Sequence, residues 1–319
     1  MKRVATIAIL LVFLTSAYSF AKKAESNKDT LIALLVIRED LIKKCVGEEI
    51  LLIGKYSGGK YGVVSYWDEK KEEMVSSRKN FFNTYKDFIV YRKGIAIKKI
   101  TIKEIRTAAF DCSEITVGSG KSISLVKNLK DFQSNLTTEA SGFSDGKDFS
   151  YKTTYYLAIN ADSPAIRTQQ YSAPIVGNVS GNNKNAIYKY AQQELIKNNK
   201  LLKPQDIIIP TLLAYNLNMD KKKDYVVVAK AENNETKESG VFVVNIMDGK
   251  VVPLLVMELT NDPDSWGNGY ELVDVFDVDG DKKPEIIVEV KGYEATGYGI
   301  YKFKNNKFIK VFDDVIYGC

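Results

Sequence analysis

The chain has 319 residues, with 45 Lys and Arg, 40 Asp and Glu, and a formal net charge of +5 at pH 7. This small excess gives no support for a nucleic-acid partner or for polybasic attachment to a membrane. The absence of histidine excludes Ser-His-Asp and Cys-His nucleophile activation and the usual histidine-containing zinc sites.

The first 21 residues have the pattern of a cleaved secretory signal. Lys2 and Arg3 precede an apolar run over residues 5–14, and Ser19-Phe20-Ala21 suits a signal peptidase. A membrane anchor is the alternative, but the apolar run is short for spanning a bilayer. A bacterial lipid anchor would require a cysteine directly after the run, and none is present there. We therefore expect a secreted or periplasmic protein with no integral membrane segment after cleavage.

Three cysteines are present, at positions 45, 112 and 319. An exported chain can form one disulfide from them and leave one thiol over. Cys45 and Cys112 form the expected pair, because both lie in the N-terminal half. Three reduced thiols are the alternative.

Residues 22–204 are expected to form an N-terminal mixed domain, rich in β structure with some helix. Residues 30–42 fit a helix capped by Asp29 or Thr30, with a strand over 31–37 as the alternative. Strands are expected within 50–67, 88–92, 95–102 and 151–160, and loops over 117–150. A helix is predicted over residues 184–200. Pro204 ends it and marks a candidate domain boundary.

From residue 205 to residue 319 the chain carries an internal repeat of short strands. YNLNMDKKKDYVVVAK (215–230) matches FDVDGDKKPEIIVEVK (276–291) at an offset of 61, and GVFVVNIMDGKVVPLL (240–255) matches GYGIYKFKNNKFIKVF (297–312) at an offset of 57. Each copy is predicted to run as loop, strand, Gly-containing loop, strand, tight hairpin turn and strand. A unit of about 60 residues built in this order is near the size of a propeller blade. A much weaker third copy is suggested at 50–70.

An acidic loop leads each copy, and the second is the richer in carboxylates. Asp277, Asp279, Asp281 and Glu285 stand at positions one, three, five and nine, and the carbonyl of Lys283 can join them at position seven. Such carboxylates repel each other by roughly 1 kcal/mol per pair in water, and more where water is excluded. A cation with five to seven oxygen ligands, as Ca²⁺ prefers, would neutralise them.

Other interpretations of this loop fit less well. Mg²⁺ demands a smaller octahedron, and Zn²⁺ prefers nitrogen and sulfur ligands. An EF-hand fails because Lys282 replaces Gly at position six and Val288 replaces Glu at position twelve. A solvated acidic turn without a metal stays open as the alternative.

The first copy is poorer in charge. Its equivalent residues are Asn216, Asn218, Asp220 and Asp224. They supply two carboxylates, and three neighbouring lysines add positive charge. Whether this loop also binds a metal is left open.

The stretch DVDGDKKPEIIVEV resembles the calcium loop of FG-GAP and VCBS repeats, known from integrin-type β-propellers, and NLNMDKKKDYVVVA resembles a degenerate second copy. The resemblance covers about residues 210–319. It implies calcium held by Asp277, Asp279, Asp281 and Glu285 with the Lys283 carbonyl. Two repeats are too few to close a propeller, so we expect a blade-like module. The alternative is that the N-terminal half contributes further, degenerate blades.

We therefore expect a mainly β protein, α+β overall, with propeller-blade-like antiparallel repeats after the N-terminal domain. The expected function is that of an exported calcium-binding protein with a binding or structural role, no catalytic residues, and an unidentified protein or carbohydrate ligand. The alternative is a secreted or periplasmic hydrolase that uses N-terminal carboxylates such as Glu48, Glu49, Glu72 and Glu73, with the repeat module as an accessory.

Overall fold

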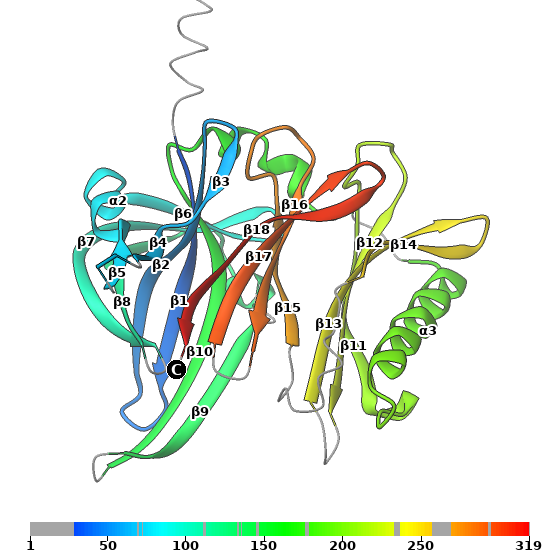
Figure 1. Ribbon diagram of the computed structural model, residues 1–319, viewed down its shortest axis with the longest axis horizontal. Helices are drawn as coiled ribbons and strands as arrows, with labels where there is room; N and C mark the ends of the chain where they lie inside the picture. The colour runs from blue at the N-terminus through cyan, green and yellow to red at the C-terminus, as the bar shows by residue number, and fades with distance from the viewer. Residues whose placement is uncertain are drawn as a thin grey trace, which may run out of the picture.

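The computed structural model describes residues 29–318, except 69, 72, 111–112, 133, 135, 145–146, 176–178, 233–236, 257–268 and 293–294. The expected signal peptide, Cys112 and Cys319 lie outside these residues, and so does the expected Cys45–Cys112 pair. Within the described part the protein is mainly β and its sheets are antiparallel, which confirms the coarse fold class (Figure 1). Among the residues described, no helix is both apolar enough and long enough to cross a bilayer.

The N-terminal part is a sheet whose strand pairings return to their starting point. The order β1-β10-β6-β7-β8-β2 closes through a β1–β2 pairing, while β3 and β9 extend β2 and β10. The strands are β1 (Thr30–Asp40), β2 (Cys45–Ser57), β3 (Lys60–Gly62), β6 (Asp87–Arg92), β7 (Ile95–Phe110), β8 (Ser113–Ser124), β9 (Thr137–Ser144) and β10 (Lys147–Asn160). We call this closed sheet the ring.

Short elements decorate the ring and connect it to the rest of the chain. They are the two-stranded sheet β4 (Ser65–Asp68) and β5 (Glu73–Ser76), helix α2 (Arg78–Thr84), and the 3₁₀ turns η1 (Leu129–Phe132), η2 (Pro164–Arg167), η3 (Gln169–Ser172) and η4 (Pro204–Asp206). The β2–β3 hairpin, where a weak third copy of the repeat was suggested, belongs to the ring and forms no four-stranded sheet of its own.

The helix predicted over 30–42 is wrong, and the alternative strand is correct. Alternate side chains of β1 are buried in two different cores. Leu31, Ala33 and Leu35 pack in one core, and Ile32, Leu34 and Val36 pack in the other. A strand buried on both faces has a continuous apolar run, which local pattern cannot distinguish from a buried helix.

The loops predicted over 117–150 are also largely wrong, because β8, β9 and the start of β10 occupy most of that range. Their content of Ser, Gly, Asn and Lys is typical of loops, but β7 approaches β8 closely at one of these glycines. A Cβ atom on Gly120 would lie 2.0 Å from the carbonyl oxygen of Thr101. Glycine in a strand interior often marks such a contact.

The predicted helix at 184–200 is confirmed as α3 (Gly181–Asn198), which begins after Ser180, whose hydroxyl accepts the Asn183 N–H at 3.4 Å. Ile187, Ala191 and Leu195 pack the helix against the first repeat sheet. The helix therefore covers one face of that sheet (Figure 1).

Each copy of the repeat forms one four-stranded antiparallel meander. The first sheet is β11 (Ile207–Tyr215), β12 (Asp224–Glu232), β13 (Lys237–Met247) and β14 (Lys250–Val256). The second is β15 (Gly269–Phe276), β16 (Glu285–Lys291), β17 (Ala295–Lys304) and β18 (Lys307–Gly318). The sequence pattern predicted the last three strands of each, and the structure adds the strand that precedes each acidic loop.

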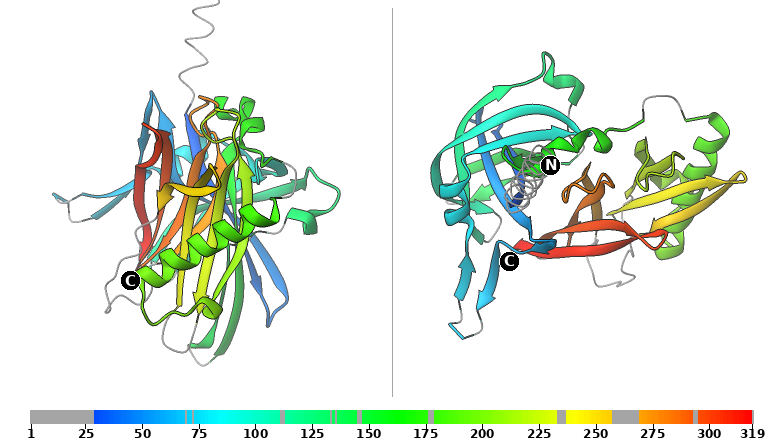
Figure 2. Two further views of the ribbon diagram at one scale, coloured as in Figure 1. Left: turned by 90° about the vertical axis from the view of Figure 1, so that its right-hand side faces the viewer. Right: turned by 90° about the horizontal axis from the view of Figure 1, so that it is seen from above.

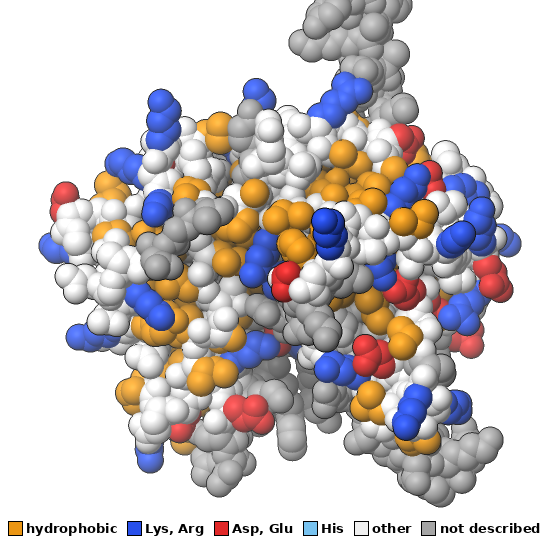
Figure 3. Space-filling model, turned by 180° about the vertical axis from the view of Figure 1, so that it is seen from behind, with side chains coloured by type: hydrophobic (Ala, Val, Ile, Leu, Met, Phe, Trp, Pro, Cys, Tyr) orange, Lys and Arg blue, Asp and Glu red, His pale blue; other side chains and the backbone are white. Residues whose placement is uncertain are grey.

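Two cores join these parts. Seen from above in Figure 2, the second repeat sheet (orange and red) lies between the ring and the first repeat sheet. One lies between the ring and the second repeat sheet, and the other lies between the two repeat sheets. Gly54 of β2 allows the aromatic side chain of Phe312 to come close, since a Cβ atom on Gly54 would lie 3.0 Å from Cζ of Phe312. On the face in Figure 3, basic and acidic side chains are interspersed with apolar ones.

A buried polar contact also fastens the ring to the second repeat. Asp274 on β15 accepts the backbone N–H of Lys93 at 3.0 Å and the N–H of Val275 at 2.8 Å. Arg92 donates to the carbonyl of Val273 at 3.5 Å and carries the opposite charge beside Asp274. Burial raises the pKa of Asp274, and the Arg92 charge acts in the opposite direction.

We expect Asp274→Ala to lower the free energy of unfolding by about 3–5 kcal/mol, because it leaves the Arg92 charge and the Lys93 N–H buried without the carboxylate. Chemical denaturation measures this loss. Glu104→Ala, at an exposed position of the ring, is the control and should change stability by less than about 0.5 kcal/mol. Equal effects of the two substitutions would contradict the proposed role of Asp274.

Candidate metal centre

The two acidic loops have the same backbone conformation. Met219 and Lys221 have φ values of 64° and 66°, and Gly280 and Lys282 at the equivalent positions have 76° and 73°. The N–H of the sixth residue donates to the first side chain in both loops, at 3.2 Å from Lys221 to Asn216 and at 2.8 Å from Lys282 to Asp277. Asp and Asn are suited to these turns because their side chains bond to nearby backbone N–H groups.

The ninth residue of each loop is a fully buried carboxylate. Asp224 accepts the N–H of Leu217 at 2.9 Å, and Glu285 accepts the N–H of Val278 at 2.8 Å. In both copies a third-strand side chain approaches the other carboxylate oxygen. In the first copy Asn245 Nδ2 donates to Asp224 at 2.9 Å. In the second copy Lys302 Nζ donates to Glu285 at 3.0 Å.

The second loop brings three carboxylates together. One oxygen from each of Asp277, Asp279 and Glu285 lies within 4.8 Å of the other two. Among the described residues this is the only group of three or more acidic, Cys or His side chains arranged to hold a metal ion. Asp277 and Glu285 have no exposed surface. The sequence pattern therefore identified three converging groups.

One oxygen in this group has no hydrogen-bond partner among the described residues. It is Oδ1 of Asp277, which is buried. The Thr168 hydroxyl is near enough to lower the pKa of this carboxyl, but that hydroxyl donates its hydrogen to the Ala165 carbonyl at 3.0 Å. Burial has the larger effect and raises the pKa of Asp277. A buried acceptor without a donor is costly, which favours a cation at this position.

Asp281 and Lys283, also expected to bind the metal, lie at the border of the group. The Asp281 side chain is 42% exposed, and its Oδ1 accepts the Lys283 N–H at 2.8 Å. Asp281 is not among the three carboxylates that converge. For Lys283, the described contact is made by its N–H, whereas the expected ligand is its carbonyl oxygen.

Lys302 is the residue that the sequence interpretation missed. Its ammonium group contacts Asp279, lies 2.8 Å from Asp281 and lies 3.0 Å from Glu285. Burial lowers the pKa of Lys302, but the surrounding carboxylates raise it further, so the net pKa is above its ordinary value. The offset of 57 between the third strands aligns Lys302 with Asn245, and that alignment was the available signal.

One ammonium group cannot balance this concentration of carboxylates. Burial raises the pKa of Glu285 to about 8, and the neighbouring charge of Asp279 adds to the rise, while Lys302 opposes it. The ring contributes a neighbour to this site, Tyr61 of β3. Burial and the nearby Glu285 carboxylate both raise the pKa of Tyr61. Tyr56 and Tyr61 pack together with ring centroids 4.9 Å apart.

The first loop closes without such an excess of charge. Asn218 Nδ2 donates to Asp220 at 3.0 Å, and the Asn245 amide satisfies one oxygen of Asp224. Burial raises the pKa of Asp224 to about 6. Asn216 accepts the Lys221 N–H, so the four expected ligands of this loop are engaged in its own turn.

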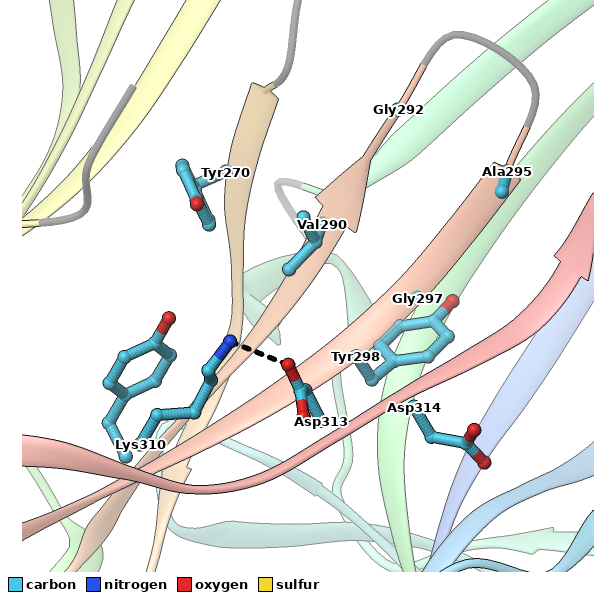
Figure 4. A pocket seen from close by; sticks show the side chains of 10 residues that line it. Tyr270, Val290, Gly292, Ala295, Gly297, Tyr298, Lys310, Asp313 and Asp314 are labelled. Atoms are coloured by element: carbon cyan, nitrogen blue, oxygen red, sulfur yellow. Dashed lines mark hydrogen bonds and ion pairs between the residues drawn. The ribbon is translucent and has the colours of Figure 1, made fainter. Parts of the chain in front are cut away.

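A separate cavity of about 520 Å³ lies on the second repeat sheet (Figure 4). Tyr270, Val290, Gly297 and Tyr301 are among the residues that line it. Lys310 and Asp313 face each other across 2.5 Å at its border.

Comparison with protein-family models, with curated proteins and with solved structures finds no match to this chain. The function is therefore inferred from the geometry of the site.

Without a bound cation, the raised pKa of Glu285 makes stability pH-dependent. Its pKa is about 8 in the folded protein against an ordinary 4.5, so the native state binds more protons between these values. The free energy of unfolding should therefore fall as pH rises from 4.5 to about 8. Glu285→Gln should flatten this fall, measured by denaturation in the presence of a chelator.

Asp281→Asn is the matched control, since its side chain is 42% exposed and it changes the same loop. It should leave the slope close to that of the wild type. A Glu285→Gln variant with the full wild-type slope would show that the carboxyl ionises normally in the fold.

Proposed function

We propose that this chain is an exported calcium-binding β-repeat protein with a structural or binding role and no catalytic site. The observation that carries the proposal is the convergence of Asp277, Asp279 and Glu285 within 4.8 Å. Two of these carboxylates are fully buried. Buried charge of one sign destabilises a fold unless it is paired or coordinates a metal.

The donor set favours calcium over other ions. All its candidate groups are oxygens, which suit a hard cation, and the loop offers no thiol or imidazole. Asp281 and the Lys283 carbonyl would complete the five to seven ligands that Ca²⁺ takes. Mg²⁺ usually keeps several waters and is held by only one or two carboxylates, so a group of three carboxylates suits it less. An affinity of roughly 10⁻⁴–10⁻³ M would suit extracellular calcium.

The position of the loop supports a structural role for the ion. The N–H of Asp277 donates to Ser172 Oγ at 2.8 Å, which connects the loop to η3. Tyr61 of the ring lies near the carboxylates of Asp279 and Glu285. A cation here would stabilise the junction between ring and repeat, by the mass action of a ligand that binds only the folded state.

The two four-stranded meanders support the blade-like interpretation. Propeller blades are four-stranded antiparallel sheets, and the two units here share strand order, loop conformation and hydrogen bonds. On this basis we propose that they are degenerate FG-GAP or VCBS-like repeats. We assign the ion to 277–285 and not to 216–224, because the amides of Asn218 in the loop and Asn245 on β13 already satisfy the carboxylates of the Asn-rich loop.

The hydrolase alternative has less support. Glu48 contacts Lys98, and Glu49 contacts Arg106. Carboxylates held in separate ion pairs are poorly placed to act together as acid and base.

We expect millimolar Ca²⁺ to raise the melting temperature of the protein by a few degrees, because the ion binds only the folded loop. Asp277→Asn should abolish the rise, since it removes a buried charge and keeps the shape of the side chain. Asp220→Asn in the first loop is the matched control and should keep it. A wild-type melting curve indifferent to Ca²⁺ would overturn the proposed function.

The cavity of Figure 4 is the proposed place for a carbohydrate ligand, because tyrosine rings and a charged pair at its border suit stacking and hydrogen bonding to a sugar. Tyr301→Ala should weaken binding about tenfold or more in an oligosaccharide array. Tyr66→Ala, at an exposed position elsewhere, should not. Equal binding by both variants would remove this cavity from the proposal.

A further inference from the structure

The ammonium group of Lys302 lies where a cation would lie. It contacts Asp279, Asp281 and Glu285, and two of these are members of the converging carboxylate group. Lys302 reaches the loop from β17, the third strand of the repeat, and is 8% exposed. Because Lys302 is a side chain of the protein itself, its positive charge stays within the site.

The first repeat shows that this position need not be charged. Asn245 has the same place on β13, and its neutral amide satisfies the buried Asp224. In that copy Asn replaces two of the four acidic residues. A neutral third-strand group therefore accompanies the loop of low charge, and an ammonium group accompanies the loop of high charge.

The ammonium group leaves part of the site unsatisfied. Asp277 is the carboxylate among the three for which no contact with Lys302 is described, and its Oδ1 accepts no hydrogen bond from the described residues. A divalent ion that contacts Asp277, Asp279 and Glu285 together would need the carboxylate oxygens that Lys302 now contacts. The ammonium and the ion would also repel each other at contact distance.

We propose that Lys302 is a tethered counterion that competes with the divalent cation for these carboxylates. In the metal-free protein it keeps the loop closed, and on metal binding it moves out toward solvent. This inference rests on the calcium site proposed above and adds an exchange mechanism to it. Lys302 would thereby weaken the affinity for Ca²⁺ and protect the fold at low Ca²⁺.

Lys302→Met tests the competition, because it keeps much of the side-chain length and removes the charge. Calorimetric titration with CaCl₂ should show about tenfold or more tighter binding than in the wild type, as expected for removing a unit charge beside a divalent ion. The variant should also melt at a lower temperature than the wild type in a chelator and recover in Ca²⁺. Lys304→Met, at an exposed position of the same strand, is the control and should change neither result.

The outcomes separate the two proposals. Equal Ca²⁺ affinity in wild type and Lys302→Met would overturn the competition and leave the calcium site standing. No binding to either protein would overturn the calcium site and the competition together. Binding to Lys302→Met alone would support the competition and overturn the proposed calcium binding of the natural chain, whose lysine would then take the place of the ion.

A labelling experiment on the wild type avoids the risk that Lys302→Met does not fold. Acetic anhydride should modify Lys302 slowly in a chelator and several-fold faster with saturating Ca²⁺, measured by mass spectrometry of its peptide. Lys304 should react at the same rate in both conditions. Lys302 labelling that does not change with Ca²⁺ would contradict its displacement.

Discussion

The buried carboxylate at the ninth position of each repeat loop is the constraint on which the C-terminal half depends. Asp224 and Glu285 each accept a backbone N–H from their own loop and a side-chain donor from the third strand. This one side chain therefore connects the first turn of the loop, the second strand and the third strand. A charge at this depth must be satisfied, and the two copies satisfy it differently.

The difference between the copies has a consequence for the whole molecule. In the first repeat, Asp224 and Asn245 lie on the sheet face opposite to the one that α3 covers. Side chains alternate along a strand, and Val226 and Val243 on that face pack against the second repeat. In the second repeat, the Glu285 carboxylate and the Lys302 ammonium group lie at the junction with the ring. Tyr61 and Ser172 are beside this site. Asp274, buried against Arg92 and Lys93, is on the strand that leads into the same loop. Changes in the ionic state of the loop would thus act on the contact between two parts of the fold.

Sequence reasoning succeeded where a pattern is local or repeated. The offset of 61 predicted both loops, and the offset of 57 predicted the hairpins after them, because each repeat folds with its own neighbours. It failed where long-range packing decides. The apolar run at 31–36 fits a helix or a strand equally well by local pattern, and only its burial between two cores makes it a strand. Gly120 is typical of a loop by residue type, but it lies in a strand that β7 approaches closely. Lys302 escaped notice because it is 17 residues from Glu285 in sequence and meets it only through strand pairing.

The most direct test of the central claim, a divalent-cation site among Asp277, Asp279 and Glu285, is lanthanide luminescence. Tb³⁺ takes the oxygen ligands that Ca²⁺ takes, and Tyr61 lies close enough to transfer excitation to an ion bound there. The account predicts tyrosine-sensitised Tb³⁺ emission that Ca²⁺ displaces and that Asp277→Asn removes. Absence of sensitised emission, or emission unaffected by Asp277→Asn, would contradict it.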